Sequence, residues 1–162
     1  NVYVKLDKKN ELEKNIDNML YDSSDFYTTV SFKLFKSISK FYNNKIAEAI
    51  IILSEQIKYL TLKDFFHLEI ELKLTLAFFY FKQEEYQYTD ELIKIVLRKV
   101  NKTKYKNAIA FIQLLDLLIN NPSKITKLKV KKLIQQFKSN NVGQNKILEC
   151  IQPEIEILSL TY

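Results

Sequence analysis

The sequence predicts an all-α fold of antiparallel helical hairpins, and three observations support this prediction. The 162 residues include one glycine and two prolines, whereas sandwiches, barrels and doubly wound sheets use many of both in tight turns. Apolar residues make up 47% of the chain, which is enough for a continuous core. Apolar residues also recur at spacings of three and four between asparagine-rich turns. We therefore expect a single helical-repeat domain over residues 1–162.

The expected helices are separated by asparagine pairs at 43–44, 120–121 and 140–141. Asparagine tolerates the left-handed conformation that ends many helices, so it can replace the missing glycines. Pro122 follows one of these pairs and suits the first turn of a helix that runs to about Lys138. The expected arrangement is hairpins at about 25–60, 61–100 and 104–138, a partial repeat over 1–22, and capping helices over 143–162.

One segment, residues 68–76, alternates apolar and polar residues in the manner of a β-strand. Its residues are mainly Leu, Glu and Lys rather than β-branched types, so we expect a helix that is buried on two sides. Shorter alternations occur at 2–6, 127–131 and 154–160. Short strands, if any, are expected only at the termini.

The turns between helices recur at a nearly constant interval. Phe41-Tyr42-Asn43-Asn44 precedes one second helix, and Phe81-Lys82-Gln83-Glu84 precedes the next one forty residues later. Leu118-Ile119-Asn120-Asn121 follows after another thirty-seven. A period of this length, made of two antiparallel helices, indicates a solenoid of helical hairpins.

Two of these stretches resemble the tetratricopeptide repeat family. Tyr80-Phe81-Lys82-Gln83-Glu84-Glu85-Tyr86 is similar to the stretch between the two helices of such a repeat, and Asn44-Lys45-Ile46-Ala47-Glu48-Ala49-Ile50 is similar to the start of its second helix. The sequence departs from the family at Asn44 and Glu84, where glycine is common, and at Thr89, where alanine is usual. The resemblance covers about residues 25–100. It implies a short right-handed α-α superhelix that binds a partner peptide or helix in the groove lined by the first helices, and it contributes no catalytic residues.

The residues that normally carry chemistry are few and scattered. His67 and Glu71 lie one turn apart, but no second histidine could complete a zinc site, so we interpret His67 as a structural residue. Cys150 is the only cysteine and is interpreted as a core thiol in a reducing, cytoplasmic setting. One glycine cannot form a phosphate-binding loop. We therefore expect no enzyme activity, cofactor or metal site.

The apolar runs and the first residue give expectations about membrane insertion and about the length of the whole protein. The longest apolar runs, Ala49–Leu53 and Leu76–Phe81, are far shorter than the ~20 residues that a membrane span needs. No secretory leader is recognisable, so we expect no membrane insertion. Because the chain begins at Asn1, we expect it to be a fragment of a longer protein.

The net charge of +6 is concentrated in one segment. Residues 101–142 contain nine lysines and one acidic residue, Asp116, while the rest of the chain is close to neutral. Arg98 is the only arginine, although arginine is the preferred residue for recognising bases and phosphates. The local basicity therefore supports an anionic partner, with nucleic acid as the alternative to protein.

Two sets of lysines are the candidate binding residues, and either set could also be an ordinary solvated face. The first set lines the first helices of two hairpins and could meet acidic groups of a partner peptide: Lys33, Lys36, Ser37, Lys40 and Lys73. The second set would form a basic ridge for nucleic acid or another anionic partner: Lys124, Lys127, Lys129, Lys131, Lys132 and Lys138. The leading hypothesis is a protein–protein interaction and scaffolding module. The oligomeric state is left open.

The 21 aromatic residues can be interpreted either as core or as platforms for stacking nucleic-acid bases. We expect the core role for most of them, because they occupy inward positions of the predicted helices, as with Phe35, Phe41, Phe78, Phe111 and Phe137. Surface positions are expected instead for Tyr27, Tyr42, Tyr80 and Tyr88.

Overall fold

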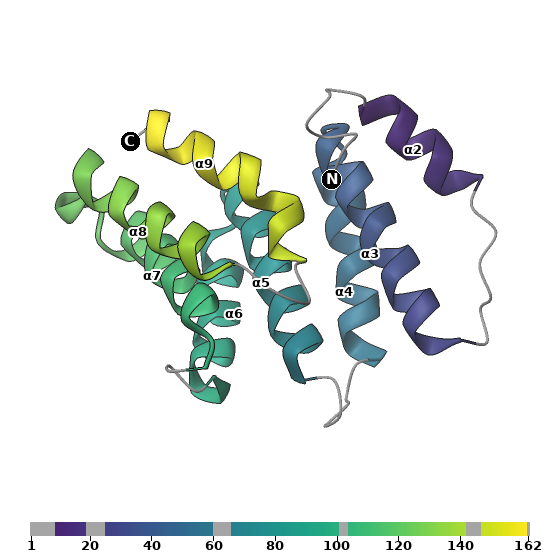
Figure 1. Cartoon of the computed structure of the whole chain (residues 1–162), viewed down its shortest axis with the longest axis horizontal. Coiled ribbons are helices and arrows are strands. Elements are labelled where there is room, and N and C mark those ends of the chain that lie inside the picture. Colours follow the sequence, from purple (N-terminus) through teal and green to yellow (C-terminus); the bar gives the residue numbers. More distant parts are fainter. Residues whose placement is uncertain (1–8, 19–24, 60–65, 101–103, 142–146, 162) are drawn as a thin grey trace. The chain divides into compact units, whose positions relative to one another are not determined.

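The computed structural model describes residues 9–18, 25–59, 66–100, 104–141 and 147–161, and its regular elements in these ranges are all helices (Figure 1). The predicted all-α class is confirmed. The chain divides into two compact units, residues 1–63 and 64–162, and each is described by itself. Within the described ranges, no helix is both long and apolar enough to cross a lipid bilayer.

The first unit contains one helical hairpin and a helix packed against it. Its helices are α2 (Lys9–Asp17), α3 (Phe26–Tyr42) and α4 (Ile46–Tyr59). Asp25 starts α3 by accepting a hydrogen bond from the backbone N–H of Thr28, which satisfies one of the free donors of the first turn. Helix α3 packs along α4, and α2 packs on α3. The buried core is supplied mainly by Val30, Leu34, Ile38, Phe41, Ala49 and Leu53.

The second unit contains two further hairpins and a C-terminal helix. Its elements are α5 (Phe66–Lys82), α6 (Tyr86–Lys99), α7 (Lys106–Asn120), the 3-10 turn η2 (Pro122–Lys124), α8 (Lys127–Asn140), the 3-10 turn η3 (Leu148–Ile151) and α9 (Gln152–Thr161). Helix α7 contacts α5, α6 and α8, as expected of a helix that is apolar almost all round. Helix α9 turns back beside α8, and η3 contacts α5 (Figure 1).

A row of aromatic rings forms the centre of the second unit. Phe111 of α7 lies between Phe78 of α5 and Phe137 of α8, with ring centroids 5.9 Å and 5.5 Å apart. All three side chains are fully buried. The core interpretation of these phenylalanines is therefore confirmed.

The first two hairpins repeat each other in the position and geometry of their turns. The bounds on either side of the turn lie forty residues apart in the two hairpins: 42 and 82, 46 and 86. Both turns place one residue in the left-handed region, Asn44 at φ 60° and Glu84 at φ 63°. After each, the next N–H returns to the first helix, from Lys45 to the carbonyl of Lys40 and from Glu85 to that of Tyr80. These are the positions at which glycine is favoured.

The alternating segment at 68–76 is helical, as expected. It lies within α5, where Ile70, Leu72, Leu74 and Leu76 are all buried because α5 is covered on several sides. The alternations at 127–131 and 154–160 lie in α8 and α9, and the one at 2–6 lies outside the described residues.

The third hairpin differs from the sequence prediction at its turn. Pro122 begins only the short turn η2, and Ile125 is extended, with φ −67° and ψ 125°. Helix α8 then starts afresh after Thr126, whose hydroxyl accepts from the N–H of Lys129. A second N-cap residue after the proline therefore sets the start of the helix.

Candidate functional site

The predicted lysine set on α3 is largely engaged within the first unit. Ser37 is fully buried, and its hydroxyl donates to the carbonyl oxygen of Ala49 over 2.9 Å. The Nζ of Lys40 lies 2.7 Å from Oε1 of Glu13 and 3.2 Å from Oε2 of Glu48. The hydrogen bond from Lys40 is the main reason that the pKa of Glu13 is below its usual range. Ser37 and Lys40 thus contribute to packing and to the attachment of α2.

The other members of this set have mixed surroundings. Lys33 and Lys36 are half-buried, and the Lys36 ammonium lies 5.9 Å from the centroid of the Phe32 ring. Lys73 belongs to the second unit, where it forms an ion pair with Glu69. Lys99 also pairs with Glu69, over 2.8 Å. Lys73 and Lys99 therefore share the one carboxylate of Glu69, and Lys73 is engaged inside the unit.

One side of α5 is covered by the chain's own C-terminal segment. The backbone N–H of Ile147 donates to Oε2 of Glu71 over 2.7 Å, and Lys82 pairs with Glu154 over 3.3 Å. The side chains of this segment that are buried in the unit are Leu148, Ile151, Ile155 and Leu158. Burial raises the pKa of the Glu71 carboxyl to about 7, although the N–H groups of Ile147 and Leu148 act in the opposite direction. This side of the first helix α5 is therefore occupied by η3 and α9.

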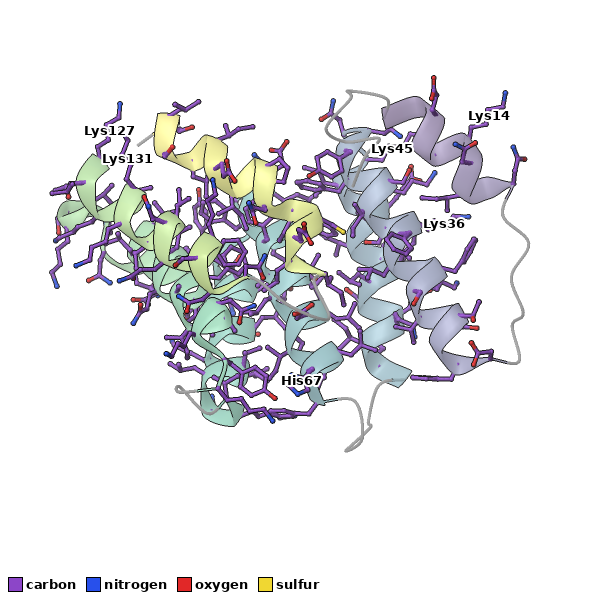
Figure 2. All side chains as sticks on the ribbon, in the orientation of Figure 1. Lys14, Lys36, Lys45, His67, Lys127 and Lys131 are labelled. Carbon is purple, nitrogen blue, oxygen red and sulfur yellow. The ribbon has the colours of Figure 1, made fainter. Side chains whose placement is uncertain are left out.

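The predicted basic ridge is exposed on η2 and α8. All six lysines have exposed side chains: Lys124, Lys127, Lys129, Lys131, Lys132 and Lys138. Figure 2 labels Lys127 and Lys131 in the first turns of α8, with Lys127 extending away from the ribbon. Lys138 pairs with Glu156, and Lys129 donates to the carbonyl of Lys124. Among described residues, no carboxylate forms an ion pair with the remaining four. The ridge therefore presents unneutralised positive charge.

Two adjoining hollows form a groove over α7, between α6 and α8. One hollow, of about 320 Å³, lies between α6 and α7, and the other, of about 390 Å³, lies between α7 and α8. Gln113 and Asp116 line both hollows, so the two adjoin along α7. The apolar lining comes from Ile93, Leu97, Ile109, Ile112, Leu117 and Leu133. We call this feature the α7 groove.

The charges of the α7 groove are unevenly distributed. On the α6 side, Lys94 pairs with Asp90 and is the main reason that the pKa of Asp90 is lowered. At the centre, the carboxylate of Asp116 accepts hydrogen bonds from the side-chain amides of Asn120 and Asn121. On the α8 side, the lining lysines are Lys129 and Lys132, and no acidic residue is present between 122 and 141. The α8 wall is therefore the positive wall.

The residues considered for chemistry do not come together. His67 is exposed in the first turn of α5 (Figure 2), and its Nε2 lies 3.3 Å from the hydroxyl of Tyr105. Glu71 faces Ile147 instead. Burial raises the pKa of the Cys150 thiol, which disfavours the reactive thiolate. Within the described ranges, no group of three or more His, Cys, Asp or Glu side chains is placed to hold a metal ion.

The sequence did not reveal the α7 groove. Leu97 is 42% exposed at the edge of the groove. Leu117 and Leu133 were not singled out, and both are half-buried. The available signal was the polar pair Gln113 and Asp116 on the otherwise apolar α7, which marks the side of that helix left open to solvent.

Comparisons with known proteins do not place the chain in a family. No family model, curated protein or solved structure matches it. The resemblance to tetratricopeptide repeats therefore stays a prediction that rests on the residues of the two turns.

Proposed function

We propose that this chain is a protein–protein interaction module that binds a peptide or helix of a partner in the α7 groove. The observation that carries the proposal is the groove itself, whose two adjoining hollows combine an apolar lining with a few polar groups. Such surfaces suit a helix that lays its apolar side into a groove. The walls of this surface come from the two hairpins of the second unit, α5–α6 and α7–α8, and surfaces built on packed helical hairpins are the usual basis of recognition by helical repeats.

The proposed site differs from the one expected from the sequence. A partner was expected along the first helices, next to Lys33, Lys36, Lys40 and Lys73. Lys40 and Lys73 already form ion pairs within their own units, and η3 and α9 cover one side of α5. The α7 groove has no such internal occupant among the described residues. It is therefore the better candidate for a partner.

Site-specific photo-crosslinking tests this proposal. A photoreactive residue at Gln113, at the centre of the groove, is compared with the same residue at Gln135, an exposed position of α8 outside the groove lining. We expect the Gln113 probe to form adducts with one reproducible peptide segment of a partner, and the Gln135 probe to form none with that segment. Equal labelling from both positions, or none from Gln113, would refute binding in the groove.

Binding of nucleic acid through the basic ridge is the second candidate. It is favoured by the exposure of Lys124, Lys127, Lys131 and Lys132, none of which forms an ion pair with a carboxylate in the described part of the chain. This function requires affinity that falls steeply with salt concentration, since phosphate contacts release counterions. A mobility-shift assay at low salt with single- and double-stranded oligonucleotides would show no complex if the ridge serves only proteins.

The proposal includes a scaffolding role inside a larger protein and a cytoplasmic setting, and it assigns no catalysis to this chain. The cytoplasmic setting is supported by Cys150, the only cysteine of the sequence, which carries a free, half-buried thiol.

A further inference from the structure

We infer that the occupant of the α7 groove is an acidic amphipathic helix of about three turns. This inference rests on the proposed function, because it specifies the partner of the same site. It is carried by the length of the groove, the apolar lining and the one-sided charge.

The length of the groove sets the size of the ligand. The lining extends from Ile109 of α7 to Asn121, the residue directly after that helix. At 1.5 Å per residue, these twelve steps span roughly 18 Å. A partner helix lying parallel to α7 would contact it over about 12 residues.

The apolar lining sets the pattern of the ligand. Leu97 on the α6 side and Leu133 on the α8 side flank α7, and Ile109 and Leu117 lie two turns apart along it. A helix with apolar residues at i, i+3 or i+4, and i+7 presents one continuous stripe to such a floor. Leu97 remains 42% exposed in the free chain, so a ligand would remove this apolar surface from water.

The charge distribution sets the sign and the side of the ligand's polar residues. Lys129 and Lys132 line the α8 wall, and the rest of the ridge continues beyond them. Lys94 on the opposite wall is already paired with Asp90. Acidic residues of the partner are therefore favoured along the edge that faces α8, and disfavoured over Asp116 at the centre.

The same lining disfavours nucleic acid as the occupant. Among the described residues that line the two hollows, none is aromatic, so bases find no stacking surface. Asp90 and Asp116 would also repel phosphates that approached the centre. An amphipathic helix satisfies both the apolar floor and the positive wall.

Peptide binding to the full chain tests the inference directly. The probe is a fluorescein-labelled peptide of about 16 residues, with leucines in one stripe and glutamates along one edge. It is compared with a scrambled peptide of the same composition and with a peptide in which lysine replaces each glutamate. Fluorescence anisotropy at low and high salt should show saturable binding of the first peptide alone, and weaker binding at high salt, because exposed charge pairs are screened.

Matched variants of the chain locate the binding. Leu133→Ser should weaken binding about tenfold, and Leu133→Met should restore it, since methionine keeps the apolar volume. The control is Leu128→Ser, because Leu128 is 78% exposed on the same helix but does not line the groove. Lys132→Glu should weaken binding about threefold to tenfold at low salt, with Lys58→Glu on α4 as the charge-matched control. Circular dichroism verifies that each variant is folded.

Several results would overturn the inference. The first is binding of the scrambled or the lysine peptide as tight as that of the acidic peptide. The second is displacement of the bound peptide by an oligonucleotide at a lower concentration than the unlabelled acidic peptide needs. The third is concentration-dependent self-association of the chain that Leu133→Ser abolishes. The last result would make a second copy of the chain the occupant. If Gln113 crosslinks a partner segment that is not acidic and helical, the inference fails while the proposed function stands. If neither crosslinking nor peptide binding involves the groove, both fail.

Discussion

The buried Glu71 carboxyl makes the stability of the second unit depend on pH. Glu71 is 8% exposed and holds the backbone of the C-terminal segment through the N–H of Ile147. Its pKa is raised from 4.5 to about 7 by burial. The perturbation that isolates this group is Glu71→Gln, which keeps an oxygen acceptor for Ile147 but cannot ionise.

The sign of the effect follows from the direction of the shift. The folded chain binds this proton more tightly than the unfolded chain. The stabilisation of the fold by the protonated Glu71 carboxyl is therefore complete below pH 4.5 and is lost as the pH rises through about 7. At about 1.4 kcal/mol per pKa unit, ionising Glu71 reduces the free energy of unfolding by about 3 kcal/mol above pH 7. We expect Glu71→Gln to be close to wild type at pH 5 and about 2–3 kcal/mol more stable at pH 8.

Urea unfolding followed by circular dichroism at pH 5, 6, 7 and 8 measures this difference. Hydrogen exchange of the Ile147 amide is the local readout, since it should be better protected in Glu71→Gln at pH 8. The control is Glu69→Gln. Burial alone would raise the pKa of Glu69, but hydrogen bonds from Lys73 and Lys99 lower it, so that variant should lose stability at pH 7. If the free energies of unfolding of wild type and Glu71→Gln differed by the same amount at every pH from 5 to 8, the reasoning would be refuted.

Three further predictions concern the turns, the core and the attachment of α2. Glu84→Gly should stabilise the chain by about 1 kcal/mol in urea unfolding, and Asn44→Gly by less, because asparagine tolerates φ near 60° better than glutamate; an equal gain at both positions would contradict this. Phe111→Ala should cost about 3–5 kcal/mol in the same assay, because the ring is fully buried between two others, and a loss below about 1 kcal/mol would show that the core readjusts. Glu13→Gln should speed hydrogen exchange in α2 at pH 7, because it removes the ion pair to Lys40. Since the pKa of Glu13 is lowered, the exchange rate of the wild type should rise toward that of the variant only as the pH falls below about 4.5. Equal exchange rates of wild type and variant at pH 7 would argue against this role.

The sequence was sufficient to predict the helices and the hairpin period, because both depend on local patterns. Apolar spacing and the turn residues at 43–44, 80–86 and 120–121 located the turns that follow α3, α5 and α7. The main local error, at Pro122, arose because Thr126 competes as a second N-cap. Both signals are visible in the sequence, but their relative strength depends on the packing of α8.

Faces of helices were harder to predict than helices. Phe35 was assigned to the core but is 44% exposed, while Tyr42, expected at the surface, is 5% exposed. Successive residues point about 100° apart around a helix, so several residues lie near the edge of the apolar side. Whether such a residue is buried depends on the position of the partner helix. Tyr27 lies outside the residues whose side chains are described.

The candidate site was only partly predictable for the same reason. The lysines of the ridge were found because they are dense in one segment. The pairing of Lys40 with Glu13 depends on how α2 packs on α3, which charge counts do not contain. Glu69 and Lys73 are instead four residues apart on one helix, so the sequence was sufficient to predict their pairing. The α7 groove depends on three helices that meet in space, and no single stretch of sequence signals it.

The return of η3 and α9 to α5 has a consequence for the order of folding. Hairpins close contacts between near neighbours in the chain and can form as soon as they are synthesised. The contact between Glu71 and Ile147 instead joins residues 76 positions apart. During synthesis, the side of α5 that η3 contacts stays uncovered until residues 147–151 have been made. A ribosome-bound intermediate would expose this surface until then, so chaperones would be able to bind at α5.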